Sequence, residues 1–154
     1  MKILMVCLGN ICRSPMAHGL MEEKIGNHQL NWQVDSAGTS SFHQGEAPDT
    51  RAIACMEKHG INISAQQSRP FRKNDFEDFD LIFCMDKINL RNVLLLAQHK
   101  EHAARAKLIL HEIEDELTEE VPDPYYDSYN GFEHVFALLN KATDAIIKNY
   151  TNAQ

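Results

Sequence analysis

The stretch Lys2-Ile-Leu-Met-Val-Cys7, continued by Leu8-Gly-Asn-Ile-Cys-Arg13 and then Ser14-Pro15, governs how this chain begins to fold. Lys2–Cys7 is an almost continuous apolar run, which is typical of a parallel β-strand covered on both faces. Ser is a favourable N-cap and Pro suits the first helical position, so a helix is expected to begin at Ser14-Pro15. Leu8–Arg13 is therefore expected to form a loop from the end of a buried strand to the start of a helix.

The rest of the sequence alternates short apolar runs with helical periodicity. Further strands are expected at Trp32–Ala37, Leu81–Met85 and Lys107–Leu110, and further helices at Asp49–His59, at Ile88–Leu96 and from Phe132 onward. Such alternation indicates βαβ units and a parallel sheet. We therefore predict an α/β fold, a single domain over residues 1–154 with a doubly wound four-stranded parallel sheet and helices on both faces.

Charge and hydropathy exclude several classes of protein. The chain has 22 acidic and 15 basic residues and a formal net charge of −7, which makes nucleic acid a poor candidate partner. Its longest apolar runs, Ile3–Leu8 and Val93–Ala97, fall far short of the roughly 20 residues that span a bilayer, so no membrane partner is expected. The N-terminus lacks the features of a secretory signal, which favours a cytoplasmic location.

Cysteine usage points the same way. Cys7, Cys12, Cys55 and Cys84 are too sparse for a disulfide scaffold and lack the pairing of a structural zinc site. A reducing compartment with one reactive thiol fits better, with Cys55 and Cys84 expected in the core. The eight histidines show no metal-ligand pattern in the sequence, so no metal is expected.

The loop between the first strand and the first helix carries the chemistry. Backbone N–H groups of a loop that curls into a helix N-terminus converge on one point and bind anions. Arg13, six positions after Cys7, adds a guanidinium that can hold two phosphate oxygens at once. Gly9 permits close backbone approach, and Asn10 tolerates a left-handed conformation. The positive surroundings should favour the thiolate of Cys7, so the loop is predicted to bind phosphate next to a nucleophile.

Cleavage of a phenyl phosphate ester at such a loop also needs an acid that protonates the departing oxygen. This proton transfer typically accelerates the reaction by ~10²–10⁴-fold. Asp123 lies between two prolines in Val121-Pro-Asp-Pro-Tyr-Tyr-Asp127, which stiffen the backbone around its carboxyl group. Asp123 is the favoured acid, and Asp127 is the rival.

Taken together, Cys7–Ala17, Asp35–Thr39, Cys84–Asp86 and Asp123–Tyr126 resemble the low-molecular-weight protein tyrosine phosphatases, in the same order over nearly the whole chain. The resemblance implies a four-stranded parallel sheet, no metal or other cofactor, and hydrolysis of protein phosphotyrosine through a cysteinyl-phosphate intermediate. Phosphotyrosine-containing proteins would be the partners, and a monomer is expected.

The resemblance also implies roles for individual residues. Cys7 would attack phosphorus, and Asp123 would protonate the tyrosyl oxygen and then activate water. Ser14 would assist the thiolate. The equatorial oxygens would be held by Arg13 and by the amides of Leu8, Gly9, Asn10, Ile11, Cys12 and Arg13 itself. Asn10 and Ser36 would support the loop, and the cleft walls would be Ile11, Phe42, Tyr125 and Tyr126, deep enough to select phosphotyrosine over a shorter ester.

Four further positions carry expectations. Cys12 matches a second loop cysteine that can form a reversible disulfide with Cys7 under peroxide. Many family members brace the loop with a His for which Gln66 is the nearest match, and Gln66 can hydrogen-bond Asn10. Asp86 is expected either to stabilise the following helix N-terminus or to contact Arg13. Phe42 stands where many members have Trp or Tyr, so a shifted substrate preference is expected.

Three other functions remain as alternatives. A thioredoxin-coupled arsenate reductase on the same scaffold needs a relay of further cysteines, but Cys84 lies within an apolar run with no cysteine after it. Protein arginine phosphatases resemble this chain but tend to have Thr where Ile11 stands, and Ile11 favours an aromatic ester. The third alternative is a catalytically silent phosphotyrosine-binding module, which the presence of Cys7, Arg13 and Asp123 disfavours.

Overall fold

The computed structural model describes residues 1–126 and 129–153, except for the side chain of Tyr129. The strands are β1 (Lys2–Cys7), β2 (Gln33–Gly38), β3 (Leu81–Cys84) and β4 (Ala106–Leu108). The helices are α1 (Arg13–Asn27), α2 (Thr50–Lys58), α3 (Asp75–Asp78), α4 (Lys87–Leu94), α5 (Lys100–Arg105) and α6 (Tyr129–Thr151), and a 3₁₀ helix spans Ile109–Glu112. None of the described helices is both long and apolar enough to cross a membrane.

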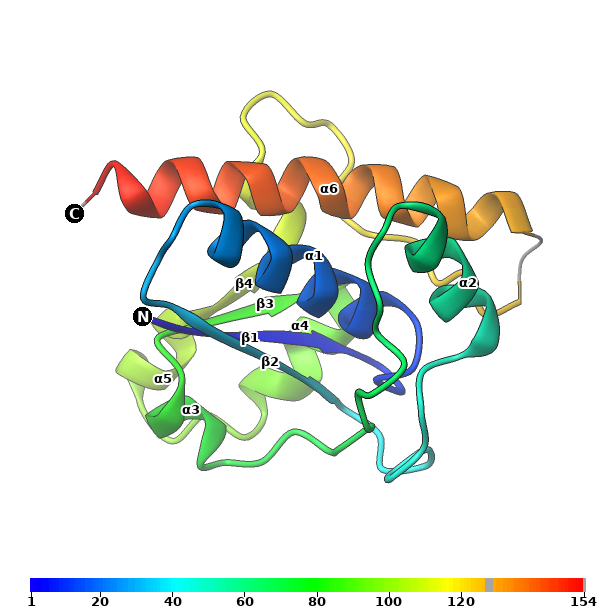
Figure 1. The fold of residues 1–154 in the computed structure, drawn as a ribbon. Helices are drawn as coiled ribbons and strands as arrows, with labels where there is room; N and C mark the ends of the chain where they lie inside the picture. Colours follow the sequence, from blue (N-terminus) through cyan, green and yellow to red (C-terminus); the bar gives the residue numbers. More distant parts are fainter. Residues whose placement is uncertain (127–128, 154) are drawn as a thin grey trace.

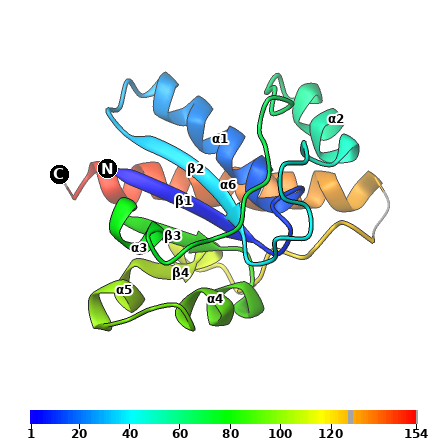
Figure 2. The same ribbon diagram turned by 90° about the horizontal axis from the view of Figure 1, so that it is seen from below.

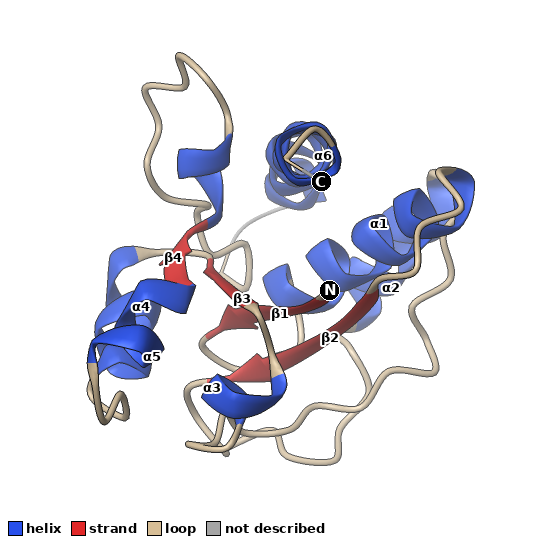
Figure 3. Cartoon of the chain, turned by 90° about the vertical axis from the view of Figure 1, so that its left-hand side faces the viewer, coloured by secondary structure: helices blue, strands red, loops and turns tan. Residues whose placement is uncertain are grey.

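The four strands form one parallel sheet in the order β2-β1-β3-β4 (Figure 1). Helices α1, α2 and α6 lie on one side of the sheet, and α3, α4 and α5 lie on the other (Figures 2 and 3). The predicted α/β fold with a doubly wound four-stranded parallel sheet is confirmed.

Alternate residues of β1 enter two different cores, as the two-residue period of a strand requires. Ile3 and Met5 are fully buried on the side of α1 and α6, whereas Leu4 and Val6 are fully buried on the opposite side. The first core also contains Met16, Leu20, Phe132 and Leu139, and the second contains Phe76, Ile82 and Val93. Burial on both faces explains why the β1 sequence is apolar throughout.

The parallel register brings the carboxyl ends of the inner strands together. Cys7 pairs with Gly38 across β1 and β2, and Val6 pairs with Cys84 across β1 and β3. In open α/β sheets, ligands bind beyond this edge. The loop that follows Cys7 therefore begins at the edge where a site is expected.

The start of α1 differs from the prediction. The helix begins at Arg13 with Cys12 as N-cap, and no side chain caps it. Ser14 already lies in the first turn, so its expected role as N-cap is wrong. Its hydroxyl group contacts Cys7 and Asn10 instead. Backbone N–H groups at the helix start are thereby left free of a side-chain cap.

Other element boundaries shifted by a few residues. The expected fourth strand ends at Leu108 and continues as the 3₁₀ helix, and α6 begins before Phe132. Helix α2 follows its N-cap Asp49, whose carboxylate accepts a hydrogen bond from Arg51 N, and the chain turns at Gly60 with φ +79°. The short helices α3 and α5 were not expected, because elements of four and six residues hardly show a helical period.

Candidate active site

A cavity of ≈ 370 Å³ opens at the carboxyl edge of the sheet. Its lining is Cys7, Leu8, Gly9, Ile11, Cys12, Arg13, Ser40, Phe42, His43, Asp123, Tyr125 and Tyr126. The cavity thus collects the expected nucleophile, phosphate clamp, acid and aromatic walls from segments far apart in the sequence. Ser40 and His43 were not expected, and the one hint of them in the sequence was their closeness to Phe42.

The loop after Cys7 turns its carbonyl groups away from the cavity. The oxygens of Cys7 and Leu8 accept hydrogen bonds from Thr39 N and Ser40 N, each at 2.9 Å. The oxygen of Ile11 accepts from Asp49 N at 2.8 Å. Within the described part of the chain, no backbone N–H of residues 8–12 donates to another protein group. These donors are available to an anion, as expected of a phosphate-binding loop.

Two residues permit the tight path of this loop. Asn10 has a φ of 55°, a left-handed conformation that Asn adopts more readily than most residues. A side chain at Gly38 would meet Leu8 O at 2.7 Å, which explains why the end of β2 needs glycine here. In the sequence, Gly38 stands out only as part of Asp35–Thr39, a segment that resembles the phosphatase family.

The hydroxyl group of Ser14 contacts both Asn10 and the sulfur of Cys7. The Oγ of Ser14 accepts a 2.7 Å hydrogen bond from Asn10 Nδ2 and lies 3.1 Å from Cys7 Sγ. Because the amide is the donor in the first contact, the Ser14 hydrogen is free to point to the sulfur. Ala37 O, at 3.5 Å, is the more distant acceptor. Cys7 is itself nearly fully buried, so its sulfur meets the Ser14 hydroxyl group largely out of contact with solvent.

Arg13 lines the cavity but is buried, and two neighbouring residues hold its guanidinium group by hydrogen bonds. Its Nη1 donates to Asp86 Oδ2 at 2.7 Å and to Val121 O at 3.0 Å. Burial opposes the charge, but the Cys7 sulfur and the hydrogen bond to Asp86 outweigh it and raise the pKa of Arg13 above its ordinary value. Arg13 therefore remains a cation beside Cys7 at any physiological pH.

Asp86 performs both of the roles that were left open. One carboxylate oxygen binds Arg13, and the other accepts a 2.7 Å hydrogen bond from Asn89 N at the start of α4. The side chain of Asn89 in turn accepts from Asp86 N, which completes a capping box. Helix α4 thus holds the carboxylate that orients the guanidinium.

Asp123 lies at the cavity beside the arginine. Its Oδ2 is 3.6 Å from Arg13 Nη2, and its Oδ1 accepts a 3.1 Å hydrogen bond from Tyr125 N. The surrounding segment is attached at both ends, by Val121 N to Met85 O at 2.8 Å and by Arg51 Nη2 to Tyr125 O at 2.9 Å. Asp127, the rival acid, lies outside the described residues.

The rim of the cavity is aromatic. Phe42 and Tyr126 are 83% and 91% exposed, and so present ring surface to an incoming ligand. Phe42 packs edge-on against His43 at 4.8 Å, and Tyr125 packs edge-on against Tyr126 at 5.0 Å. His43 also binds Glu46 through its Nδ1 at 2.6 Å.

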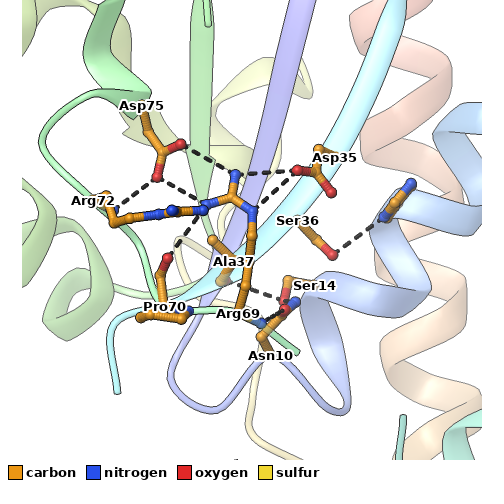
Figure 4. Close-up of polar contacts among 10 residues, drawn as sticks. Asn10, Ser14, Asp35, Ser36, Ala37, Arg69, Pro70, Arg72 and Asp75 are labelled. Atoms are coloured by element: carbon orange, nitrogen blue, oxygen red, sulfur yellow. Dashed lines mark hydrogen bonds and ion pairs between the residues drawn. The ribbon is translucent and has the colours of Figure 1, made fainter. Parts of the chain in front are cut away.

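Two expected supports of the loop are placed elsewhere. Ser36 Oγ contacts His18 Nδ1 on α1 at 3.2 Å, and not the loop (Figure 4). Gln66 Nε2 donates to Pro15 O at 3.1 Å, and not to Asn10. Both expectations are wrong because the partner of each side chain depends on how α1 packs on the sheet. Burial lowers the pKa of His18 below its ordinary value, so this imidazole is neutral at pH 7.

The loop is instead supported by the segment before α3. Ser68 Oγ donates to Gly9 O at 2.9 Å. Arg69 N donates to Asn10 Oδ1 at 3.1 Å, as Figure 4 shows. Neither residue was singled out from the sequence, because their contacts join positions about sixty residues apart.

The remaining cysteines are all free and buried. Cys55 and Cys84 belong to the two cores, as expected. Cys12 lines the cavity with Cys7, but burial and the nearby carboxylate of Asp49 raise the pKa of its thiol. The thiol of Cys12 therefore remains protonated at neutral pH.

Two groups of metal-ligating side chains occur among the described residues, although neither lines the cavity. They are Cys55, His59 and Glu133, and Glu77, His99 and His102. In each group a His Nε2 contacts a carboxylate, at 2.9 Å for His59 and Glu133 and at 2.6 Å for His102 and Glu77. Each group joins two elements that are distant in sequence, so no spacing along the chain could have indicated it.

Comparison with known proteins agrees with this geometry. The sequence profile described as "Low molecular weight phosphotyrosine protein phosphatase" matches residues 2–153. The human low molecular weight phosphotyrosine protein phosphatase is 39% identical over 150 residues, which cover 96% of this chain and 94% of the relative. The crystal structure of a protein tyrosine phosphatase from Entamoeba histolytica, with Hepes in its active site, superposes with a TM-score of 0.94 and 37% identity, covering 99% of this chain and 98% of that one.

A second solved structure points to variation in substrate within the same fold. The drosophila arginine phosphatase DARP superposes with a TM-score of 0.91 and 30% identity, and covers 97% of this chain and 98% of its own. The profile match over nearly the whole sequence, together with these relatives, establishes the family. The chain belongs to the low molecular weight phosphotyrosine protein phosphatases.

Proposed function

We propose that residues 1–154 act as one phosphatase domain that hydrolyses phosphotyrosine in proteins through a cysteinyl-phosphate intermediate. One observation carries the proposal. The sulfur of Cys7 lies at a loop with unused N–H groups, in one cavity with the Arg13 guanidinium and the Asp123 carboxyl group. Nucleophile, oxyanion donors and acid are the three parts that transfer of a phosphoryl group to a thiolate requires.

In the first step, the thiolate of Cys7 attacks phosphorus and the bond to the tyrosyl oxygen breaks. The phosphoryl oxygens are held by the loop amides and by Arg13, which the ion pair to Asp86 at 2.7 Å keeps in orientation. Asp123 gives its proton to the departing phenolate oxygen, so tyrosine leaves as a neutral phenol.

In the second step, water attacks the phosphorus of the cysteinyl phosphate. The carboxylate of Asp123, now deprotonated, accepts a proton from this water, and the P–S bond breaks to release phosphate and the Cys7 thiolate. The hydrogen bond from Ser14 stabilises the sulfur as a leaving group. Asp123 regains its proton in this step and is ready for the next turnover.

The cleft supports an aromatic ester as the substrate. Phe42 and Tyr126 extend from the mouth of the cavity, while Cys7 lies buried at its base. A phosphorylated phenol is long enough to reach from the rim to the sulfur, whereas a phosphoserine would leave its phosphorus short of it. A displacement of about 1 Å at the reacting centre can already cost ~10²-fold in rate.

This substrate class can be tested with matched peptides that carry phosphotyrosine, phosphoserine or phosphoarginine. We expect the native protein, without added metal, to hydrolyse the phosphotyrosine peptide at least ~10²-fold faster than the phosphoserine peptide. The measurement is kcat/KM from phosphate release. Equal rates on both esters would contradict the proposed depth selection, and no release from any ester would contradict phosphatase function.

Phosphoarginine is a second candidate because of the likeness to the arginine phosphatase DARP. Ile11 argues for the aromatic ester, since its nearly buried apolar side chain lines the cavity and cannot hydrogen-bond a guanidinium. In the same assay, Ile11→Thr should raise the rate on phosphoarginine relative to phosphotyrosine. If the native protein prefers phosphoarginine, then phosphoarginine and not phosphotyrosine is its substrate.

Arsenate reduction is disfavoured by the positions of the thiols. Cys84 is fully buried in β3, and Cys55 is fully buried on α2. Neither lines the cavity, so neither can readily relay electrons from a Cys7 adduct to thioredoxin. Arsenate-dependent oxidation of reduced thioredoxin by the native protein would overturn this argument.

We further propose that Cys12 protects Cys7 under oxidising conditions. Hydrogen peroxide converts the Cys7 thiolate to a sulfenic acid, and the sulfur of Cys12 displaces its hydroxyl as water to form a disulfide. After a peroxide pulse and thiol reduction, native protein should recover most of its activity and Cys12→Ser should recover several-fold less. Rates are compared with each variant's own untreated rate, and equal recovery would contradict the role.

We propose a cytoplasmic location and a monomeric state as well. A cysteine nucleophile is preserved best in a reducing compartment, and all four cysteines are free. Cell fractionation that finds the protein in an oxidising compartment, or sedimentation that finds a dimer at assay concentration, would contradict these assignments.

A further inference from the structure

We propose that Arg69 is a positioning residue, whose anchored backbone N–H fixes the phosphate-binding loop through Asn10. The proposal rests on the proposed function, because it concerns the same nucleophile. Arg69 does not line the cavity and acts through other residues. The connection runs from two carboxylates, Asp35 on β2 and Asp75 at the start of α3, through Arg69 and Asn10 to Ser14 (Figure 4), whose hydroxyl group contacts the sulfur of Cys7.

The side chain of Arg69 is clamped by Asp35 and Asp75. Its Nη1 and Nη2 donate to the two oxygens of Asp75, each at 3.1 Å, and its Nε donates to Asp35 Oδ2 at 3.1 Å. A planar guanidinium can satisfy both carboxylates at once, which an ammonium group cannot do in the same geometry. Asp75 is nearly buried, so solvent screens this contact less than a surface ion pair.

The backbone of Arg69 is attached to the end of β2 at the same time. Arg69 O accepts a 2.9 Å hydrogen bond from Gly38 N, and Gly38 O accepts one from Phe71 N at 2.7 Å. The side-chain clamp and the backbone pairing together fix the direction in which the Arg69 N–H points. It donates to Asn10 Oδ1 at 3.1 Å.

This N–H determines which way the Asn10 amide faces. A backbone N–H can only donate, so it selects the oxygen of the amide and turns Nδ2 toward Ser14. Nδ2 then donates to Ser14 Oγ at 2.7 Å, which leaves the Ser14 hydrogen for Cys7 Sγ at 3.1 Å. The direction of each hydrogen bond in this series is therefore determined by the N–H of Arg69.

The same contact supports a backbone conformation with an intrinsic cost. Asn10 has a φ of 55°, and a non-glycine residue is held in this region at an energetic cost that the surrounding contacts must offset. The hydrogen bonds to Arg69 and Ser14 occupy both ends of its amide. Release of one end should let the loop relax and misplace both its N–H groups and the Ser14 hydroxyl.

We would test this with Arg69→Met, which removes the clamp but keeps the backbone N–H and most of the side-chain volume. We expect kcat/KM on a phosphotyrosine peptide to fall by about 10- to 100-fold. We also expect the pH profile of Cys7 alkylation by iodoacetamide to move to higher pH, because Ser14 no longer supports the thiolate. Arg69→Lys, which keeps the charge but not the fork, should lie between Met and native.

The matched control is Arg72→Met. Arg72 is exposed, has the same charge and lies in the same segment, and its contact with Asp75 is made by its backbone N–H. We expect kcat/KM and the alkylation profile of this variant to stay near native. A loss equal to that of Arg69→Met would mean that overall charge, and not the clamp, is responsible.

A double-mutant cycle with Asn10→Ala separates positioning from a general loss of stability. If Arg69 acts through the Asn10 amide, Arg69→Met should lower kcat/KM by less than about threefold in the Asn10→Ala background. A full 10- to 100-fold loss in that background, or a native alkylation profile for Arg69→Met, would overturn the proposal. The alkylation readout needs no substrate, so it tests Arg69 even if the native protein fails to hydrolyse phosphotyrosine.

Discussion

Replacement of Cys7 by serine is expected to abolish hydrolysis of a phosphotyrosine peptide, with a loss of at least ~10⁴-fold in kcat, as for other enzymes deprived of their nucleophile. A thiol can ionise next to the loop amides and Arg13, whereas a serine hydroxyl is far less acidic and stays protonated in the same place. The amides and Arg13 remain in the variant, so it should still bind the peptide. Turnover is measured by phosphate release, and binding by calorimetry with the same peptide.

The control for Cys7→Ser is Cys84→Ala. Cys84 is a fully buried thiol at the end of the adjacent strand β3, and burial raises the pKa of its thiol. Its removal should leave turnover close to native. Retained activity in Cys7→Ser would contradict the assignment of the nucleophile, and binding without turnover by the native chain would indicate a silent binding module.

Asp123→Asn is the second change with a large expected effect. We expect a loss of ~10²–10⁴-fold in kcat on a phosphotyrosine peptide, because the tyrosyl oxygen leaves poorly without a proton. The loss should be much smaller on p-nitrophenyl phosphate, whose leaving group is a weak base. Since Arg13 keeps its 2.7 Å ion pair with Asp86, the phosphate clamp should survive the substitution.

The comparison between the two esters distinguishes an acid from a residue that merely shapes the cleft. An equal loss on both would contradict the role of Asp123 as the proton donor. Asp127→Asn is the matched control, because Asp127 was the rival in the same segment. If Asp127→Asn shows the leaving-group dependence and Asp123→Asn does not, the acid is Asp127.

Much of the fold was predictable from local patterns. The apolar run of β1 predicted a strand covered on both faces, and its alternate residues do enter two cores. The 3.6-residue stripe of the last helix predicted α6, which begins three residues earlier than expected. The short helices α3 and α5 were missed because they follow from the contacts of the chain around them and not from a period of their own.

The residues proposed to carry the chemistry were predicted better than the residues that support them. Cys7, Arg13 and Asp123 were expected from residue type, spacing and family resemblance, and the structure places all three at one cavity. The supports were predicted less well. Ser36 and Gln66 contact α1 and not the loop, since packing sets which side chains reach which acceptors.

The order of strands and loops along the chain, and the residue types at the proposed phosphate-binding loop, were specified in the sequence alone, because apolar strand runs, helical periodicity and anion binding by a loop depend on near neighbours. The bracing of that loop by Ser68 and Arg69, the double role of Asp86 and the placement of Asp123 beside Arg13 arose from tertiary contacts. Each joins residues tens of positions apart, whose meeting depends on how the helices pack across the sheet.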